Sequence, residues 1–368
     1  MNTRLYISLF ALLFLVGCKP HDEHFIGDIH HVNIDILNIT KRTDLPIVHL
    51  SPVMETQNNT EGFLVCDSFA FFFNHVSERF VDVYNIYTKE KIGEHIRKGH
   101  GRNEFVSIAQ FSLLYKENGE LKTLTNASPE NQYFIWNITQ SLKSGKDSIE
   151  NPSVQRWRDF YHCPPQILGK FSDSLMVGTT ASVRDADGKI LSCPGIHVIN
   201  SHNGKNVRTI KPFDNPIAND NSIVLPERFF GGSTRANLDV KKIITAYYYL
   251  PIISVVDLET TKVNGFLFDE SLDYSVFETD MKNARKCFSR ITSNDKNIYA
   301  LWNGKNISDK SIADGFNTLI ILDWDGNLVK IVKTDKNVNN IYYDQFSGIL
   351  YGCSEKESML YKVNFEKI

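Results

Sequence analysis

The sequence predicts an all-β fold: a six-bladed β-propeller of four-stranded antiparallel blades, with the ring closed by an N-terminal strand. The first observation is a repetition of short β-branched and aromatic runs separated by turn signals, clearest between Asn297 and Phe365. The second is the 12% aromatic content, which favours β-structure. The third is that the last repeat lacks a strand, which a closed ring must take from elsewhere in the chain.

Residues 1–17 have the pattern of a signal peptide. Arg4 supplies a positive charge, and Leu5 to Val16 form an apolar segment too short to span a bilayer. The ending Leu15-Val16-Gly17-Cys18 resembles a bacterial lipobox, and this resemblance implies a lipid attached to Cys18. The mature chain is therefore expected outside the cytoplasm, held to a membrane by its lipid anchor.

The chain after the signal peptide divides into a tether and one domain. Residues 18–31 are polar and His-rich and are expected to form a lipidated tether, while residues 32–368 are expected to form the propeller. Lys19-Pro20-His21-Asp22-Glu23 loosely resembles a surface-export signal of some Gram-negative anaerobes. The protein is therefore expected to be an outer-membrane lipoprotein, on either the cell surface or the periplasmic face.

Charge and cysteine content exclude several classes of function. The formal net charge is −3 and no long basic block occurs, so no nucleic-acid partner is expected. The cysteines after Cys18 are odd in number and form no Cys-x-x-Cys motif, which argues against a disulfide framework or a zinc site. They are Cys66, Cys163, Cys193, Cys287 and Cys353. Burial of these cysteines is expected, and a pairing of Cys163 with Cys193 stays open.

Six successive units are predicted along the chain. The first has four strands, at Phe63–Cys66, Phe69–Phe73, Phe80–Tyr84 and Lys91–Ile96. The others are expected at Phe105–Trp136, Gln166–Pro212, Lys242–Phe268, Cys287 through the Asp325-Gly326 hairpin, and Val338–Phe365. Roughly 320 residues in six units give about 53 per blade, slightly above the usual propeller repeat. The excess is assigned to loops such as Ser141–Arg158 and Phe213–Asn237.

The ring-closing strand is predicted at Val32–Ile39. The sixth unit, Val338–Phe365, has room for only three strands. Val32–Ile39 alternates apolar and polar residues, with one change of phase near Leu37 that suggests a bulge. This segment is therefore expected to complete the sixth blade.

Three segments resemble the TolB-like six-bladed β-propeller lipoproteins of bacterial envelopes. Arg97 to Phe105 resembles the Gly-x-Gly-x-x-Glu-Phe junction after the first blade, although Arg102 stands where that family often has proline. Ile298 to Gly304 and Leu319 to Asn327 are similar to its fifth-blade strands. The resemblance implies the fold and an envelope location, and it implies no particular activity.

The Arg97–Phe105 junction is also the first candidate ligand site. Its two glycines permit close backbone approach, and Arg97, His100, Arg102 and Glu104 could present charge at the mouth of the channel. The alternative is an inter-blade connector in which Glu104 or Arg97 binds local backbone groups and Phe105 fills the core.

A second candidate site lies in a long loop with basic and aromatic side chains. Arg158, Tyr161 and His162 could bind a carbohydrate or peptide, or they could be ordinary loop anchors. Tyr247-Tyr248-Tyr249 alternates faces along a strand, so at least one ring is expected to face solvent or a groove.

The absence of catalytic motifs favours a binding module over an enzyme. No Gly-x-Ser-x-Gly, His-Glu-x-x-His or phosphate-loop motif occurs, and no cofactor or metal ligand is predicted. A non-catalytic propeller that binds a glycan, a peptide or an envelope protein is the leading hypothesis. The alternative is a metal-centred propeller hydrolase or lyase, for which Asp67, Asn126, Thr179 and Thr245 lie near the expected channel.

Overall fold

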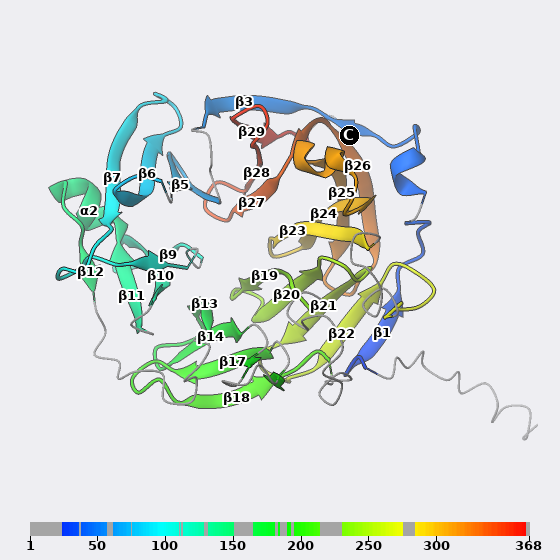
Figure 1. The fold of residues 1–368 in the computed structure, drawn as a ribbon, viewed down its shortest axis with the longest axis horizontal. Helices are drawn as coiled ribbons and strands as arrows, with labels where there is room; N and C mark the ends of the chain where they lie inside the picture. The colour runs from blue at the N-terminus through cyan, green and yellow to red at the C-terminus, as the bar shows by residue number, and fades with distance from the viewer. Residues whose placement is uncertain are drawn as a thin grey trace, which may run out of the picture.

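The chain forms six β-sheets arranged as the blades of a ring, and each blade runs from an inner strand to an outer one (Figure 1). This computed structural model describes residues 24–36, 38–56, 62–74, 76–109, 111, 113–128, 132–150, 165–180, 183–184, 190–192, 195–213, 230–274 and 284–365. The arrangement confirms the predicted six-bladed propeller of mainly antiparallel sheets.

The first three blades follow one another in chain order. Blade 1 consists of β4 (Phe63–Cys66), β5 (Phe69–Phe73), β6 (Arg79–Asn85) and β7 (Lys91–Arg97), as predicted. Blade 2 consists of β8 (Ser107–Ile108), β9 (Tyr115–Glu117), β10 (Glu120–Ser128), β11 (Gln132–Asn137) and β12 (Ile149–Glu150). Blade 3 consists of β13 (Gln166–Lys170), β14 (Leu175–Thr180), β17 (Gly195–Asn200) and β18 (Asn206–Ile210). A separate small sheet pairs β15 (Val183–Arg184) with β16 (Ile190–Ser192).

The last three blades each take an additional strand from the N-terminal segment. Blade 4 consists of β19 (Gly232–Asn237), β20 (Lys242–Tyr247), β21 (Ile252–Asp257), β22 (Val263–Leu267) and the parallel β1 (Asp28–His31). Blade 5 consists of β23 (Arg285–Ser293), β24 (Asn297–Asn306), β25 (Phe316–Asp323), β26 (Leu328–Val338) and the parallel β2 (Ile47–Val48). Blade 6 consists of β27 (Asn340–Asp344), β28 (Ile349–Ser354), β29 (Met359–Val363) and β3 (Leu50–Glu55).

The ring is closed by an N-terminal strand, but that strand is β3 and not Val32–Ile39. β3 pairs antiparallel with β29 and leads into blade 1. Pro52 lies in this outermost strand, where a residue without an N–H is tolerated, and the register shifts beside it. The predicted location of the closing strand was therefore wrong: the strand begins at Leu50, not at Val32.

The alternation of apolar and polar residues in Val32–Ile39 does not come from a β-strand. The N–H groups of Ile34 and Ile36 donate to the carbonyls of Val32 and Ile34, so the backbone makes tight turns and not a ladder. Ile39 begins a short 3-10 helix, η1 (Ile39–Lys41). Val32, Ile36 and Ile39 are buried in the core shared by blades 4 and 5. The apolar periodicity therefore records burial against the outside of the ring.

The tether prediction for residues 18–31 also needs correction at its C-terminal end. Phe25 is buried, forms an isolated bridge with Phe213, and packs against that ring at 5.1 Å between centroids. Asp28–His31 is strand β1. The polar, His-rich composition concealed two core residues, Phe25 and Ile29, so the folded domain includes residues 24–31.

Two predicted loops contain regular structure. In the Ser141–Arg158 region, α2 (Ile138–Ser144) precedes β12, with Asn137 capping its start and Gly145 ending it at φ 67°. In Phe213–Asn237, the inner strand of blade 4 is β19, whose Gly-Ser-Thr-Arg-Ala-Asn sequence has little β-strand signal. A second 3-10 helix, η4 (Lys310–Asp314), joins β24 to β25.

Large aromatic side chains fill the space between neighbouring blades. Phe71 of blade 1 contacts Trp136 of blade 2 at 5.9 Å between ring centroids. Phe288 of blade 5 contacts Phe268, which follows blade 4, at 5.4 Å. Complete burial of one such side chain is worth roughly 1.5–3 kcal/mol. The blades are therefore held together mainly by apolar packing.

Three of the predicted buried cysteines are found in this core. Cys66, Cys287 and Cys353 are buried free thiols, which confirms the prediction for these three. Burial raises the pKa of each thiol to about 12. Cys163 and Cys193 lie outside the described residues, so their pairing stays open.

Candidate functional site

A polar cavity of about 310 Å³ opens where the inner strands of blades 4, 5 and 6 end. Its lining comes from β19, β23 and β27 and from the turns that follow them, together with Leu113 of blade 2. These strands lie nearest the ring centre (Figure 1). The cavity is therefore the mouth of the central channel on one face of the ring.

Hydrogen bonds between blades 4 and 5 hold one side of this mouth. The Asn237 amide donates to the Ser293 hydroxyl at 3.3 Å and to the Asn294 carbonyl at 2.8 Å. Asn294 in turn uses its side chain to hold its own turn, accepting from the Asn297 N–H at 2.6 Å. The polar groups of this part of the rim are thus positioned before any ligand arrives.

Blade 6 completes the rim and reaches across the channel. The Tyr343 N–H donates to the Thr292 hydroxyl of blade 5 at 3.1 Å. The Gln345 amide donates to the Leu114 carbonyl of blade 2 at 2.8 Å. This hydrogen bond joins two blades that are not adjacent in the ring, so Gln345 ties blade 6 to blade 2.

Charges of both signs line the cavity. Asp239 and Asp295 are exposed at its rim, and Arg235 is half-buried in its wall. One guanidinium nitrogen of Arg235 donates to the Thr234 carbonyl at 3.0 Å. Among the described residues, Arg235 makes no ion pair with an acidic side chain.

A second cavity, of about 240 Å³, lies beside the first between blades 2 and 3. Two of its charged groups pair with each other, Glu117 with Lys170 at 2.8 Å, and Glu117 also pairs with the nearby Lys122 at 3.2 Å. Hydrogen bonds from these two lysines lower the pKa of Glu117. The charges of this cavity are used within the protein, in contrast to Arg235.

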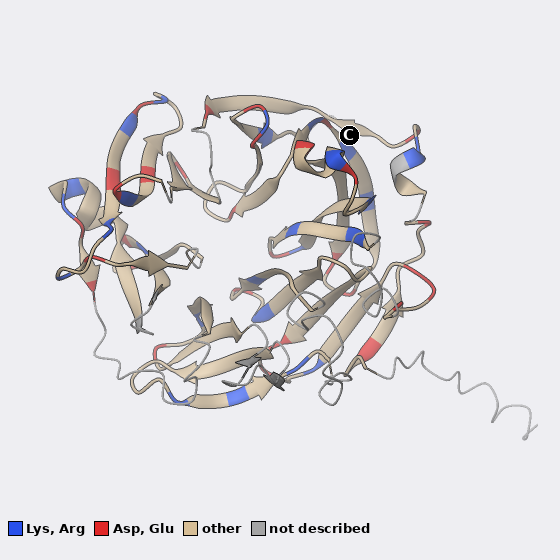
Figure 2. Ribbon diagram, in the orientation of Figure 1, with Lys and Arg blue, Asp and Glu red and all other residues tan. Residues whose placement is uncertain are grey.

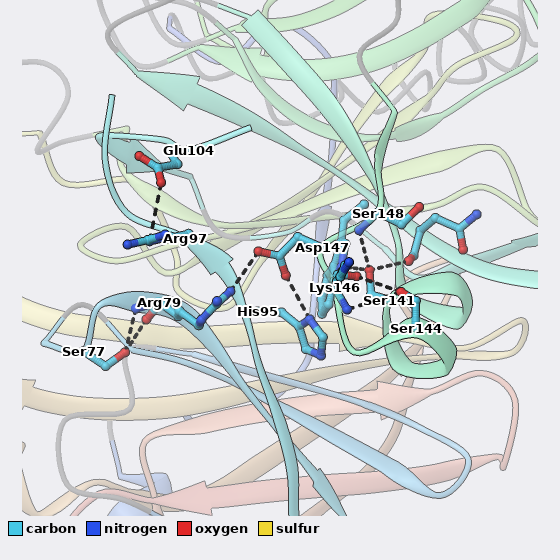
Figure 3. A network of polar contacts seen from close by, with 12 residues as sticks. Ser77, Arg79, His95, Arg97, Glu104, Ser141, Ser144, Lys146, Asp147 and Ser148 are labelled. Carbon is cyan, nitrogen blue, oxygen red and sulfur yellow. Dashed lines mark hydrogen bonds and ion pairs between the residues drawn. The ribbon is translucent and has the colours of Figure 1, made fainter. Parts of the chain in front are cut away.

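The Arg97–Phe105 junction has the geometry of an inter-blade connector. Glu104 pairs with Arg97 at 3.4 Å and accepts the Gly101 N–H at 3.0 Å (Figure 3). Phe105 is buried and stacks on Phe134 at 4.1 Å between centroids. Glu104 therefore organises its own loop.

The other charged residues of that junction lie on the surface. His100 and Arg102 are exposed, and Arg97 is 59% exposed. None of the four candidates, including Glu104, lines the two cavities described above. Their proposed role in ligand binding at the channel mouth stays a prediction without structural support.

A polar network ties blade 1 to blade 2 beneath this junction (Figure 3). Asp147 pairs with Arg79 at 3.0 Å and contacts the buried His95 ring at 3.0 Å. Burial acts to raise the pKa of Asp147, but hydrogen bonds from His95 and the Ile96 N–H, with the Arg79 charge, lower it overall. Ile96 is held at φ 60°, a strained conformation for a β-branched residue. The network therefore fixes an unusual backbone and joins two blades.

The remaining candidate residues from the sequence do not form a site in the described part of the chain. Cys18, Arg158, Tyr161 and His162 lie outside the described residues. Of the four polar residues named for a metal-centred site, the side chains of Asn126, Thr179 and Thr245 form hydrogen bonds within the protein. Asp67 is exposed, and its backbone N–H donates to the Asp344 carboxylate. Within the described ranges, no group of three or more His, Cys, Asp or Glu residues could hold a metal ion.

The basic residues that distinguish the channel have no recognisable signal in the sequence. Arg235 lies on β19, in a segment predicted to be a loop, and Lys286 and Arg290 lie on β23. Figure 2 shows basic residues on both of these inner strands. The sequence feature that comes closest to indicating this site is the tyrosine run, because one of its rings is expected to face solvent or a groove and Tyr248 contacts Arg290. No membrane-spanning helix is found in the described part of the chain.

Solved structures of low sequence identity are similar to this chain. A DUF4221 family member from Bacteroides vulgatus matches with a TM-score of 0.52 and 11% identity, covering 87% of this chain and 98% of that chain. A luciferin-regenerating enzyme matches with a TM-score of 0.48 and 13% identity, covering 87% and 96%. Regucalcin, a calcium-binding protein from Agrobacterium tumefaciens, matches with a TM-score of 0.48 and 11% identity, covering 87% and 95%.

The DUF4221 likeness shows the fold alone, because that structure is only 11% identical. No protein-family model matches the chain, and no curated protein matches it in sequence. Membership of the TolB-like family therefore stays a prediction, while the six-bladed fold is established.

Proposed function

We propose that this protein is a non-catalytic binding module whose ligand, a glycan, a peptide or part of an envelope protein, enters the channel mouth. The observation that carries the proposal is the polar cavity of about 310 Å³ at the ring centre. Ligand sites commonly measure about 300–1,000 Å³, so this cavity suits one sugar residue or one or two amino-acid side chains. A larger ligand would insert one such group and rest on the surrounding face.

The rim supports binding because its hydrogen-bonding groups are already positioned. Asn237, Thr292 and Gln345 each bridge two blades, so little side-chain freedom remains to be lost when a ligand binds. The lining offers hydroxyl, amide and carboxylate groups, which suit the hydroxyl and amide groups of glycans and peptides.

The test is a screen of the full chain, purified in detergent, against glycan and peptide arrays. Asp239→Trp places a bulky ring at an exposed position on the rim, and we expect it to abolish the binding found with the wild type. Glu90→Trp, at an exposed turn of blade 1, is the matched control and should bind normally. Equal binding by both variants would place the ligand elsewhere and overturn the channel assignment.

The proposed anchor is a lipid on Cys18, which would hold the propeller at the outer membrane. The support is the Leu15-Val16-Gly17-Cys18 lipobox and the preceding apolar segment. Labelling with a radioactive fatty acid should mark the wild type and leave Cys18→Ser unlabelled. Protease treatment of whole cells then distinguishes a surface protein, which is cut, from a periplasmic one, which is protected.

The alternative of a metal-centred hydrolase or lyase is distinguished by elemental analysis of the purified full chain. A divalent ion at one equivalent per chain would favour this alternative over the binding module.

A further inference from the structure

Three basic side chains gather around Tyr248 at the inner strands of blades 4 and 5. Arg290 donates to the Tyr248 hydroxyl at 3.4 Å. The Lys286 ammonium lies over the Tyr248 ring at 5.8 Å from its centroid and over the Phe316 ring at 5.7 Å. Arg235 lies near both Tyr248 and Arg290, and the Arg290 charge acts on it. We refer to Arg235, Lys286 and Arg290 as the channel cations.

The channel cations are half-buried but have no acidic partner at ion-pair distance among the described residues. Glu355 acts on Lys286 only at longer range. Burial and the charge of Arg290 lower the pKa of both Arg235 and Lys286. Like charges gathered away from water oppose each other, so this arrangement is costly unless an anion compensates it.

The two arginines also retain hydrogen-bonding capacity. A guanidinium carries five N–H donors in a planar fork that matches carboxylate and phosphate oxygens. Arg235 makes one hydrogen bond, to the Thr234 carbonyl, and Arg290 makes two, to the Ser289 carbonyl at 3.1 Å and to Tyr248. Most of their donors are therefore available to a bound oxyanion.

The cavity provides the route to these donors. Arg235 and Tyr342 line the 310 Å³ cavity and also a small void deeper in the channel, bordered by inner residues of blades 1, 2 and 3. Arg235 is thus accessible from the mouth, and Arg290 lies on the neighbouring inner strand, β23. A ligand that fills the cavity therefore contacts Arg235 directly.

We propose that the channel is an oxyanion-binding site in which Arg235 and Arg290 bind a carboxylate, sulfate or phosphate group of the ligand and Lys286 adds positive charge. The inference rests on the proposed function and makes it more specific. A sugar acid, a sulfated or phosphorylated glycan, and a peptide carboxylate all share this chemistry, and neutral ligands lack it.

The experiment is calorimetric titration of the full chain in detergent with inorganic phosphate, sulfate and glucuronate, at low and high salt. We expect binding of at least one probe, weakened by salt. Arg235→Gln and Arg290→Gln should each weaken binding at least tenfold, because charge-assisted hydrogen bonds are lost. Lys296→Gln, at an exposed lysine that lines none of the described cavities, is the matched control and should bind as the wild type does.

A second set of variants separates binding from folding. Arg235→Lys keeps the charge but loses the planar fork, so it should fold and bind phosphate better than Arg235→Gln, yet more weakly than the wild type. The relative affinity for glucuronate and phosphate then identifies the source of the oxyanion. Failure of all three probes to bind, or unchanged binding by Arg235→Gln and Arg290→Gln, would overturn the site.

Failure of this site and failure of the proposed function give different results. If an array ligand is blocked by Asp239→Trp but binds Arg235→Gln normally, the binding module stands and the oxyanion site falls. If the probes bind through Arg235 while Asp239→Trp has no effect on array ligands, the oxyanion site stands and the channel-mouth function falls.

Discussion

The blade 1–blade 2 junction and the channel both bury basic side chains, but only the junction supplies an acid for them. At the junction, Asp147 contacts Arg79 and His95 at 3.0 Å each. At the channel, the charge of Arg290 acts on Arg235, and neither arginine has a carboxylate at ion-pair distance among the described residues. Arginine is therefore paired with a carboxylate at the blade 1–blade 2 junction, whereas the channel arginines have no such partner among the described residues.

This difference in charge pairing indicates which region is suited to bind a ligand. A buried charge paired within the protein contributes to folding, and removing its partner is strongly destabilising. A buried charge without a partner opposes folding, so its presence calls for an external partner. The predictions below test this distinction in order of decreasing expected effect.

Asp147→Asn should cause the largest loss of stability. It leaves Arg79 without its counter-charge and weakens the hold on the strained Ile96. We expect the free energy of unfolding to fall by about 3 kcal/mol, at the low end for a broken buried pair because Arg79 is 35% exposed. Urea denaturation at neutral pH measures it. A loss under about 1 kcal/mol would show that the network is not a structural junction.

Acidification should destabilise the wild type through His197, a buried histidine that lies outside both regions. His197 lies between the Thr180 and Thr209 hydroxyls, at 2.9 and 3.1 Å, and burial lowers its pKa to about 4. Between pH 4 and about 6.5 the unfolded state binds more protons, so stability rises with pH and is fully present above that range. From pH 7 to pH 5 the loss should be about 2 kcal/mol.

The measurement for His197 is the difference between two pH series. Urea denaturation of the wild type and of His197→Gln, from pH 7 to pH 4.5, isolates this residue from the other histidines. The variant should show a shallower dependence on pH. Parallel curves would mean that His197 titrates equally in the folded and unfolded states.

Replacing an arginine by methionine should have opposite effects in the two regions. Arg235→Met removes an uncompensated cation and should raise the free energy of unfolding of the ligand-free protein by about 1 kcal/mol. Arg79→Met removes a paired one and should lower it. Thermal and urea unfolding of both variants, at the same salt concentration, test the contrast. If both substitutions destabilise equally, the channel cation is also structural.

Glu104→Gln should have the smallest effect. Its partner Arg97 is 59% exposed, and exposed pairs contribute about 0.5 kcal/mol, less at high salt. The Gly101 N–H can still bond to the amide oxygen. Urea denaturation at two salt concentrations is the check, and a loss above about 2 kcal/mol would indicate a larger role for the junction loop.

Much of the fold was predictable because strand and turn signals are local. Phe63–Cys66 and the three strands that follow were predicted within about two residues, since aromatic and β-branched runs end at clear turns. β19 was missed because Gly232–Asn237 has almost no such signal and forms a strand only by pairing with β20. The closing strand was misplaced because Val32–Ile39 is amphipathic through burial on the outside of the ring.

The candidate site was much less predictable than the fold. The interpretation of Glu104 as a residue that holds its own loop agrees with the structure, but the residues that line the channel mouth were not predicted. Arg235 and Gln345 are ordinary residues in sequence, and only their position at the ring centre gives them a role. Convergence of inner strands from several blades has no signature in any one segment.

The sequence by itself determined the repeat, the turns and the six-blade count, because each depends on neighbouring residues along the chain. Only the tertiary structure decided that β3 closes the ring and that Arg235 and Arg290 lie on neighbouring inner strands without an acidic partner among the described residues. Ring closure and charge compensation depend on which distant strands become neighbours, and that is settled by packing between blades.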